Sequence, residues 1–251
     1  MKVKNALPVL FGILLLLIWE YVPVVFDVPK YLLPRFSEVI GSLVDNKETV
    51  RINLSITAYE AFIGFLFGSS LGFLFGVVVA ESRVIRDVIS PYLIGVNAIP
   101  IIALAPLIII WFGSGVTSKV IMAAFLCFFP VTVNTIKGLT NRPRVFERLF
   151  MVYGASRYEF LVKFKIINAL PFIFSGLKLS ATYASIGAIV AEFTGADKGI
   201  GFAILRASYN LDSPRLWGYI LLAGLLGLSF YGLVSLVERF TPKHFRHGTS
   251  V

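Results

Sequence analysis

Two ionisable residues, Lys178 and Glu192, lie in a long apolar stretch where charged side chains are rare. The two positions are fourteen residues apart, about 21 Å along a helix axis, so the two side chains cannot pair directly within one helix. A charge at such depth is costly and usually faces a cavity, a pathway or a partner. Three roles are open to Lys178: a contact for a passing anion, a pair with an acidic group of a neighbouring chain, or a lysine whose ammonium reaches lipid phosphate.

The sequence contains no arrangement of residues that is typical of catalysis. Its two histidines, His244 and His247, lie in a polar tail, where such a pair is more often solvated than metal-binding. There is no P-loop motif, no HExxH motif and no Ser/His/Asp set. The single Cys127 excludes an intrachain disulfide and lies in an apolar run, where a thiol is usually buried. We therefore expect neither enzyme activity nor a bound metal or cofactor in this chain, and any energy source must come from another subunit.

The composition excludes a soluble protein. Of the 251 residues, 57% are hydrophobic and 15% are charged, whereas soluble domains have about 45–50% and about 25%. The mean hydropathy is +0.83. Such a chain cannot cover a surface that faces water, and it cannot be a disordered chain or a disulfide-rich secreted module. We interpret it as an all-α, polytopic membrane protein.

Uncharged runs predict the membrane spans, because about 20 apolar residues cross a hydrocarbon core of about 30 Å. We expect a single transmembrane domain over residues 1–251. No A-x-A-type cleavage site follows the first run, so we expect that run to be a retained anchor. Three prolines interrupt the longest uncharged stretch, residues 89–118. The six expected helices are residues 7–25, 61–80, 96–112, 120–137, 169–191 and 216–237.

The distribution of basic residues predicts the orientation of the chain. If both termini are cytoplasmic, the inner segments hold 14 Lys and Arg and the outer segments hold eight. This excess follows the positive-inside rule. We expect a multi-pass protein of the cell membrane with both termini in the cytoplasm. The net charge of +9 does not indicate nucleic-acid binding, because no basic stripe is interleaved with aromatic residues.

The inner segment 142–165 has the pattern of two short helices separated by a turn. Gly154 suits the left-handed position that ends a helix, and Ser156 with Glu159 forms a capping box that begins the next one. This segment is either a docking surface for a cytosolic partner or a helix that rests on the lipid headgroups. The first helix carries an apolar stripe at helical spacing after Pro143, formed by Phe146, Leu149, Phe150 and Tyr153.

A stripe of glycines at spacing four lines one face of the second expected span. Such a stripe lets a neighbouring helix approach closely. Two explanations are open: packing within one subunit, or a seam between two subunits. The glycines are Gly64, Gly68, Gly72 and Gly76.

A series of short motifs is spread over about residues 30–240. The central stretch reads Asn97-Ala-Ile-Pro100-Ile-Ile-Ala-Leu-Ala-Pro106-Leu-Ile-Ile-Ile-Trp111-Phe-Gly113-Ser-Gly115. Further motifs are Phe129-Pro130, Asn134-Thr-Ile-Lys-Gly138, Gly154-Ala-Ser156, Leu170-Pro171, Gly176-Leu-Lys178, Ala191-Glu192 and Gly199-Ile-Gly201. In this order they resemble the permease subunits of binding-protein-dependent ABC importers. The similarity is greatest to the branch that takes up nitrate, sulfonate, taurine, bicarbonate and thiamine precursors.

The resemblance implies a type I importer permease that works as a homodimer in the lipid bilayer. Two cytosolic ATPase subunits would use ATP and Mg, and an extracytoplasmic binding protein would deliver a small solute, such as an anion or a vitamin precursor. The alternative is a secondary carrier or channel without an ATPase, which would favour inverted repeats, and we find no such similarity between the halves. The implied ATPase-coupling residues are Glu147, Leu149, Phe150, Tyr153, Gly154, Ala155 and Ser156. The implied pathway residues are Asn97, Pro100, Pro106, Asn134, Lys178 and Glu192.

The cytoplasmic motif departs from the family pattern at one point. The family has Glu-Ala-Ala, three further residues and then a glycine. Alignment on Gly154 places Arg148, Leu149 and Phe150 at the Glu-Ala-Ala positions, with Glu147 one residue early. We therefore consider the turn from Phe150 to Gly154 a better candidate for the ATPase contact than Glu147.

Overall fold

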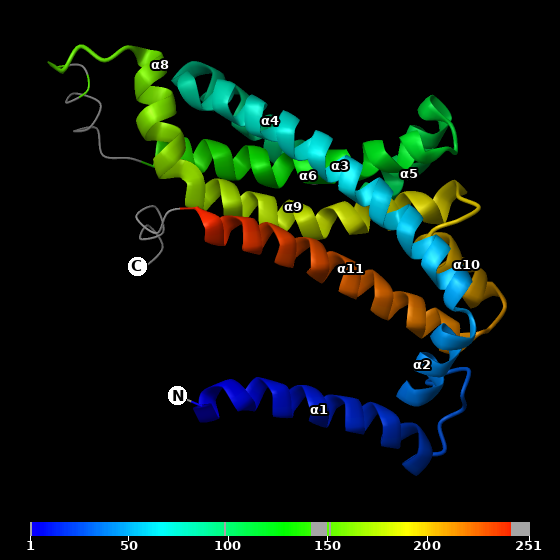
Figure 1. Cartoon of the computed structure of the whole chain (residues 1–251). Coiled ribbons are helices and arrows are strands. Elements are labelled where there is room, and N and C mark those ends of the chain that lie inside the picture. Colours follow the sequence, from blue (N-terminus) through cyan, green and yellow to red (C-terminus); the bar gives the residue numbers. More distant parts are fainter. Residues whose placement is uncertain (1, 98, 142–149, 151, 242–251) are drawn as a thin grey trace.

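The computed structural model describes residues 2–97, 99–141, 150 and 152–241. Helices account for nearly all of this part, and it contains no strand (Figure 1). The helices are α1 (Lys2–Val25), α2 (Phe36–Asp45), α3 (Lys47–Glu81), α4 (Arg83–Asn97), α5 (Ile101–Phe112), α6 (Val116–Thr140), α8 (Arg157–Phe160), the π-helix η1 (Leu161–Lys165), α9 (Ile166–Gly195), α10 (Ile200–Tyr209) and α11 (Ser213–Phe240).

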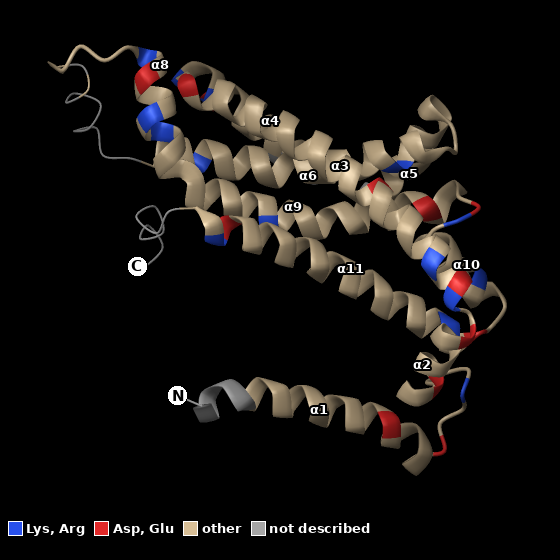
Figure 2. Ribbon diagram, in the orientation of Figure 1, with Lys and Arg blue, Asp and Glu red and all other residues tan. Residues whose placement is uncertain are grey.

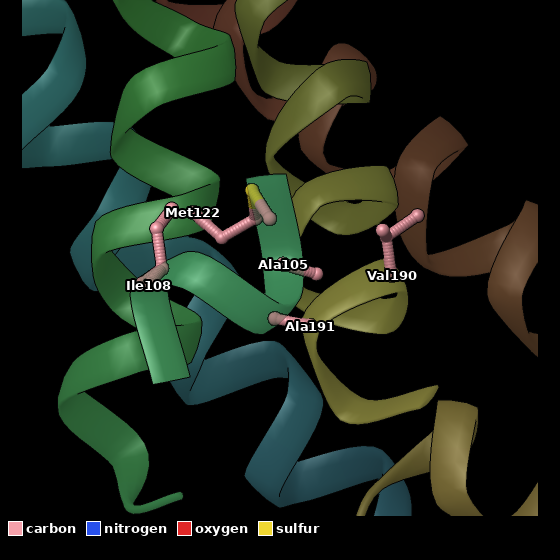
Figure 3. Packing of buried hydrophobic residues seen from close by; sticks show 5 residues of the cluster. All are labelled: Ala105, Ile108, Met122, Val190 and Ala191. Carbon is pink, nitrogen blue, oxygen red and sulfur yellow. The ribbon is translucent and has the colours of Figure 1, made fainter. Parts of the chain in front are cut away.

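The centre of the bundle is formed by α3, α6 and α9, which pack against one another, and α11 lies along α9 (Figure 1). Small residues occupy many of the contacts, because in lipid the association of helices depends on close packing rather than on apolar burial. One buried cluster joins three helices (Figure 3). Its members are Ala105 and Ile108 of α5, Met122 of α6, and Val190 and Ala191 of α9.

The glycine stripe of α3 lies against α6 of the same chain. A Cβ built on Gly72 would lie 2.5 Å from the carbonyl oxygen of Phe128, and one on Gly76 would lie 2.8 Å from the Cβ of Thr135. Gly64 and Gly68 have equally close neighbours on α6. The stripe therefore brings two helix backbones together within one subunit.

The region expected to form one span at residues 96–112 differs from that expectation. It is divided between α4, which ends at Asn97, and α5, which begins at Ile101 after Pro100. Proline has no N–H to continue the helical hydrogen bonds, and it restricts the residue before it. The 12 residues of α5 extend about 18 Å, which is less than the hydrocarbon thickness of about 30 Å.

The other long helices all extend beyond the expected spans, and α3 does so most. The 35 residues of α3 extend about 52 Å, so this helix begins well before residue 61. The helix α9 runs from Ile166 to Gly195 instead of 169–191. Within the described residues, five helices are long and apolar enough to cross a membrane: α1, α3, α6, the continuous α8–α9 helix and α11.

The first helix stands apart from the bundle and is joined to it at one end (Figure 1). The indole of Trp19 lies 5.5 Å from the ring of Phe36 in α2 and 5.3 Å from the ring of Trp217 in α11. Its N–H donates to the Pro34 carbonyl oxygen at 3.0 Å. The apolar side chains along the rest of α1 are largely exposed, as expected of a helix that faces lipid.

Charged residues gather near the ends of the long helices (Figure 2). Next to α2, Lys30 pairs with Glu38 at 3.1 Å. Burial alone would raise the pKa of Glu38, but the bonds from Lys30 and the Arg35 backbone N–H outweigh it and lower that pKa below 4.5. This end of the molecule is therefore held partly by polar contacts outside the apolar bundle.

Candidate functional site

The predicted coupling segment is described in part. Glu147 and Leu149 lie outside the described residues. Phe150 is half-buried, and its ring lies 5.0 Å from Phe160 and 5.4 Å from Phe164. Phe150 therefore packs against the helix that follows it in its own chain. Val152 and Tyr153 protrude most among the described apolar side chains of this segment, being 83% and 81% exposed, and Tyr158 is 73% exposed.

The turn after these residues has the geometry that its sequence predicts. Gly154 adopts φ +71°, a left-handed conformation in which a Cβ would be strained. The Ala155 N–H donates to the Phe150 carbonyl oxygen at 3.0 Å. Ser156 then caps α8, since its hydroxyl accepts from the Glu159 N–H at 3.2 Å. The exposed pair thus lies beside a defined turn and a capped helix start.

The capped helix is continuous with a membrane-spanning helix. From Arg157 the chain runs through α8 and η1 into α9 without a break. Lys165 of η1 is buried, and its ammonium pairs with Glu81 at the end of α3 at 2.5 Å. The turn is therefore connected to α9 by an unbroken helix and, through this ion pair, to α3.

Lys178 has a partner that the sequence did not reveal. Its ammonium lies 2.5 Å from a carboxylate oxygen of Glu238, near the end of α11. The two side chains are 21% and 23% exposed. None of the three roles considered from the sequence included an intrachain partner, and this pair arises because α11 packs along α9. Lys178 is therefore a tether between two helices in this subunit, and its expected place in the translocation pathway stays a prediction.

The other expected pathway residues are scattered. Pro100 caps α5 and Pro106 lies within it, and both are exposed. Asn97 is the last residue of α4. Asn134 of α6 is half-buried, and its amide donates to the Pro130 carbonyl oxygen at 2.8 Å. None of these four residues lines the recess beside α2 or the recess between α9 and α10.

Glu192 is only 1% exposed and belongs to a buried polar cluster. The cluster also contains Thr57 and Glu60 of α3 and Lys119 of α6. The expected spans 96–112 and 120–137 leave Lys119 in the short segment between them, and Glu60 was not considered as a site residue. The positions of both residues in the sequence could have indicated them. Glu60 directly precedes the uncharged run that begins at residue 61, and Lys119 separates two such runs.

A recess lies beside this cluster, between the end of α9 and α10. Its volume is about 570 Å³, and Phe193, Phe202, Arg206 and Tyr209 contribute to its walls. Within the described residues no group of three or more His, Cys, Asp or Glu could hold a metal ion. The two candidate regions in the described part are therefore a protruding turn at the α8 end and a buried polar cluster at the α10 end.

The chain belongs to the family of binding-protein-dependent transport system inner membrane components, whose model matches residues 68–242. The protein is thus a permease subunit of an ABC importer, of the branch that includes nitrate, sulfonate and taurine permeases, and it lies in the inner membrane. Relatives are named as permeases, which are transport subunits rather than enzymes.

Two relatives match nearly the whole chain. A probable ABC transporter permease protein of Haemophilus influenzae is 31% identical and covers 96% of this chain and 98% of its own length. The formylaminopyrimidine transport permease protein ThiX of Halalkalibacterium halodurans is 32% identical and covers 92% of each chain. The inward-facing MetNI methionine ABC transporter gives a TM-score of 0.60 at 18% identity, covering 76% of this chain and 94% of that one. This likeness shows the type I permease fold.

Proposed function

We propose that two copies of this chain form one transmembrane permease whose transport is driven by two cytosolic ATPase subunits docked at the turn of Val152 and Tyr153. The family match favours this reading over a secondary carrier or channel. ATP and Mg act in the ATPase, and this chain itself holds no cofactor. The solute path follows the interface between the two copies, which the exposed prolines of α5 would line.

One observation carries the proposal: two large apolar side chains protrude beside a fixed turn. Val152 and Tyr153 are more than four-fifths exposed and lie within a segment rich in basic residues. Positive charge marks the cytoplasmic side of a membrane protein, so these side chains would face water unless a partner covers them. Large apolar residues exposed to water mark interaction sites.

Two matched variants test this docking site. Tyr153→Asp adds a charge where the contact would bury Tyr153, and the permease should insert normally but no longer retain its ATPase on purification. Tyr209→Asp is the control, because Tyr209 is 83% exposed but lies in α10 at the other end of the bundle (Figure 1). If Tyr153→Asp still retained the ATPase and its solute-stimulated ATP hydrolysis, the docking site would be placed wrongly.

The solute is proposed to be a small anion or a vitamin precursor that an extracytoplasmic binding protein delivers. Support comes from the relatives, whose names include nitrate import in Synechococcus elongatus and taurine transport in Escherichia coli. Purification of the assembled transporter with its binding protein, followed by uptake assays with nitrate, taurine and formylaminopyrimidine, tests this assignment. Failure of all three to stimulate ATP hydrolysis would contradict the proposed solute class.

Both termini are proposed to be cytoplasmic, as the distribution of basic residues indicates. A single cysteine at Ala155, in a Cys127→Ser background, can be probed with a thiol reagent that does not cross membranes. The native thiol is fully buried, so its removal lowers the background only slightly. Labelling should occur in inverted vesicles and not in intact cells. Labelling from outside intact cells would reverse the proposed orientation.

A further inference from the structure

The buried polar cluster lies where α3, α6, α9 and α10 meet, at the end of the bundle remote from α8 (Figure 1). Glu60 is 3% exposed, and Glu192 and Lys119 are each 1% exposed. Two acidic side chains and one basic side chain are thus enclosed together. Buried charges are costly unless they are paired and hydrogen-bonded, so each group requires a stated partner.

Glu192 is surrounded by donors. The Thr57 hydroxyl donates to one of its oxygens at 2.6 Å, and the Gly201 N–H donates to the other at 2.5 Å. The Thr57 oxygen also accepts from the Ile200 N–H at 2.8 Å. The Asn53 carbonyl oxygen is a second acceptor for the Thr57 hydroxyl at 3.1 Å, so Glu192 is the nearer of the two. These bonds attach α3 and α9 to the first turn of α10, where the N–H groups have no carbonyl partner within the helix and favour a negative charge. Glu192 is therefore well suited to remain a carboxylate.

Glu60 has the opposite surroundings. Its carboxyl group is a hydrogen-bonding neighbour of Glu192, while its Oε2 atom is buried and has no partner in the described part of the chain. Two carboxylates in contact, away from water, repel each other strongly. If Glu60 were ionised, its buried Oε2 atom would lack a hydrogen-bond donor, and its negative charge would lie beside that of Glu192.

Lys119 does not resolve this conflict. Its ammonium donates to the carbonyl oxygens of Ser114 and, at 2.9 Å, of Gly195, and no ion pair joins it to either carboxylate among the described residues. Asp197, in the loop between α9 and α10, is a further acidic neighbour of Lys119. The surrounding groups thus provide one cation for more than one carboxylate.

We propose that this cluster is a proton-binding site in which a single proton, held by Glu60, forms a hydrogen bond to the carboxylate of Glu192. The proton removes the like-charge contact and gives Glu60 a partner. The remaining charge of Glu192 is balanced by Lys119 and by the N–H groups of α10. The bound proton thus fastens α3 to α9 and, through Glu192, to α10, a property that the proposed transport role neither states nor requires.

Infrared spectroscopy detects such a proton directly. A protonated carboxyl group has a C=O stretching band, separate from carboxylate bands, that shifts in D₂O. The full-length permease should be measured in the complex in which it is isolated, at neutral pH, in a detergent without carbonyl groups. Glu60→Gln should lose one such band. Glu20→Gln is the control, because Glu20 accepts bonds from Ser37 at 2.9 and 2.7 Å and should show no loss.

Thermal unfolding of two isosteric variants gives a second test. The amide of Glu60→Gln can donate to Glu192 as the acid does, so the Tm should be unchanged. In Glu192→Gln an NH₂ group replaces one of the two oxygens that accept from Thr57 and Gly201. Two donors then face each other, and the Tm should fall by about 5 °C or more.

Three outcomes would overturn the proposal. The first is an unchanged infrared band in Glu60→Gln. The second is a Tm loss or failed assembly in Glu60→Gln equal to that of Glu192→Gln, since the carboxylate of Glu60 would then be required. The third is a wild-type protein without the band whose Tm rises with Na⁺ or K⁺, because a cation would then occupy the place of the proton.

Discussion

Replacement of Gly68 by alanine tests the tight contact between α3 and α6. A Cβ on Gly68 would overlap the backbone of Ala124, with its Cα at 2.7 Å and its carbonyl oxygen closer still. Backbone atoms cannot rotate away as the end of a flexible side chain can. The two helices must therefore separate locally, and the neighbouring contacts of Gly64 and Gly72 are disturbed as well.

The magnitude follows from two opposing effects. Forcing an additional carbon into a packed core costs about 1–3 kcal/mol, and the overlap with backbone places Gly68→Ala at the upper end. Alanine is the better helix former by about 1 kcal/mol, which leaves a net loss of about 2 kcal/mol. Gly232→Ala in α11 gains the same helix preference, but nothing lies within 4 Å of its Cβ. The two variants should therefore differ by about 3 kcal/mol in the free energy of unfolding.

The assay is thermal unfolding of the detergent-solubilised complex, followed by loss of helical circular dichroism. For a chain of this size, about 3 kcal/mol corresponds to a Tm difference of about 6–12 °C. Gly68→Ala should melt lower than wild type, and Gly232→Ala should melt at or slightly above it. Equal melting of the two variants would show that the glycine stripe is not packed against α6 as described.

Three further perturbations act on ion pairs. Lys178→Met should destabilise the protein by about 1–3 kcal/mol, because it leaves Glu238 half-buried and unpaired. The double variant Lys178→Glu/Glu238→Lys should recover the Tm, and an unchanged Tm in Lys178→Met would refute the tether. Glu81→Gln should leave the permease folded but lower solute-stimulated ATP hydrolysis, since Lys165 no longer links η1 to α3; full stimulation would refute this link. The bonds from Lys30 and the Arg35 N–H lower the pKa of Glu38 below 4.5. These bonds therefore stabilise the folded protein above pH 4.5, and this stabilisation is lost as the pH falls through the lowered pKa. Glu38→Gln should therefore melt with a weaker pH dependence below pH 4.5 than wild type does.

The sequence predicted features that depend on neighbouring residues or on composition. The membrane class follows from the apolar content, and most spans follow from uncharged runs that match the hydrocarbon thickness. The left-handed Gly154 and the cap at Ser156 were also readable, because a turn and a capping box are decided within a few residues. The prolines in the stretch 89–118 indicated that it could not form one straight helix, but they did not predict that α5 begins only at Ile101.

The partners of the ionisable residues were decided by the tertiary structure. Lys178 meets Glu238, which lies 60 residues further along the chain, and Glu60 meets Glu192 across 132 residues. A helical pattern fixes which residues share a face of one helix, but it does not fix which faces of different helices meet. Which faces meet depends on how the glycine stripe of α3 packs against α6 and how α11 packs along α9. The sequence alone therefore determined that this protein is a helical permease, and only packing between distant helices decided which of its buried charges are tethers and which form the cluster.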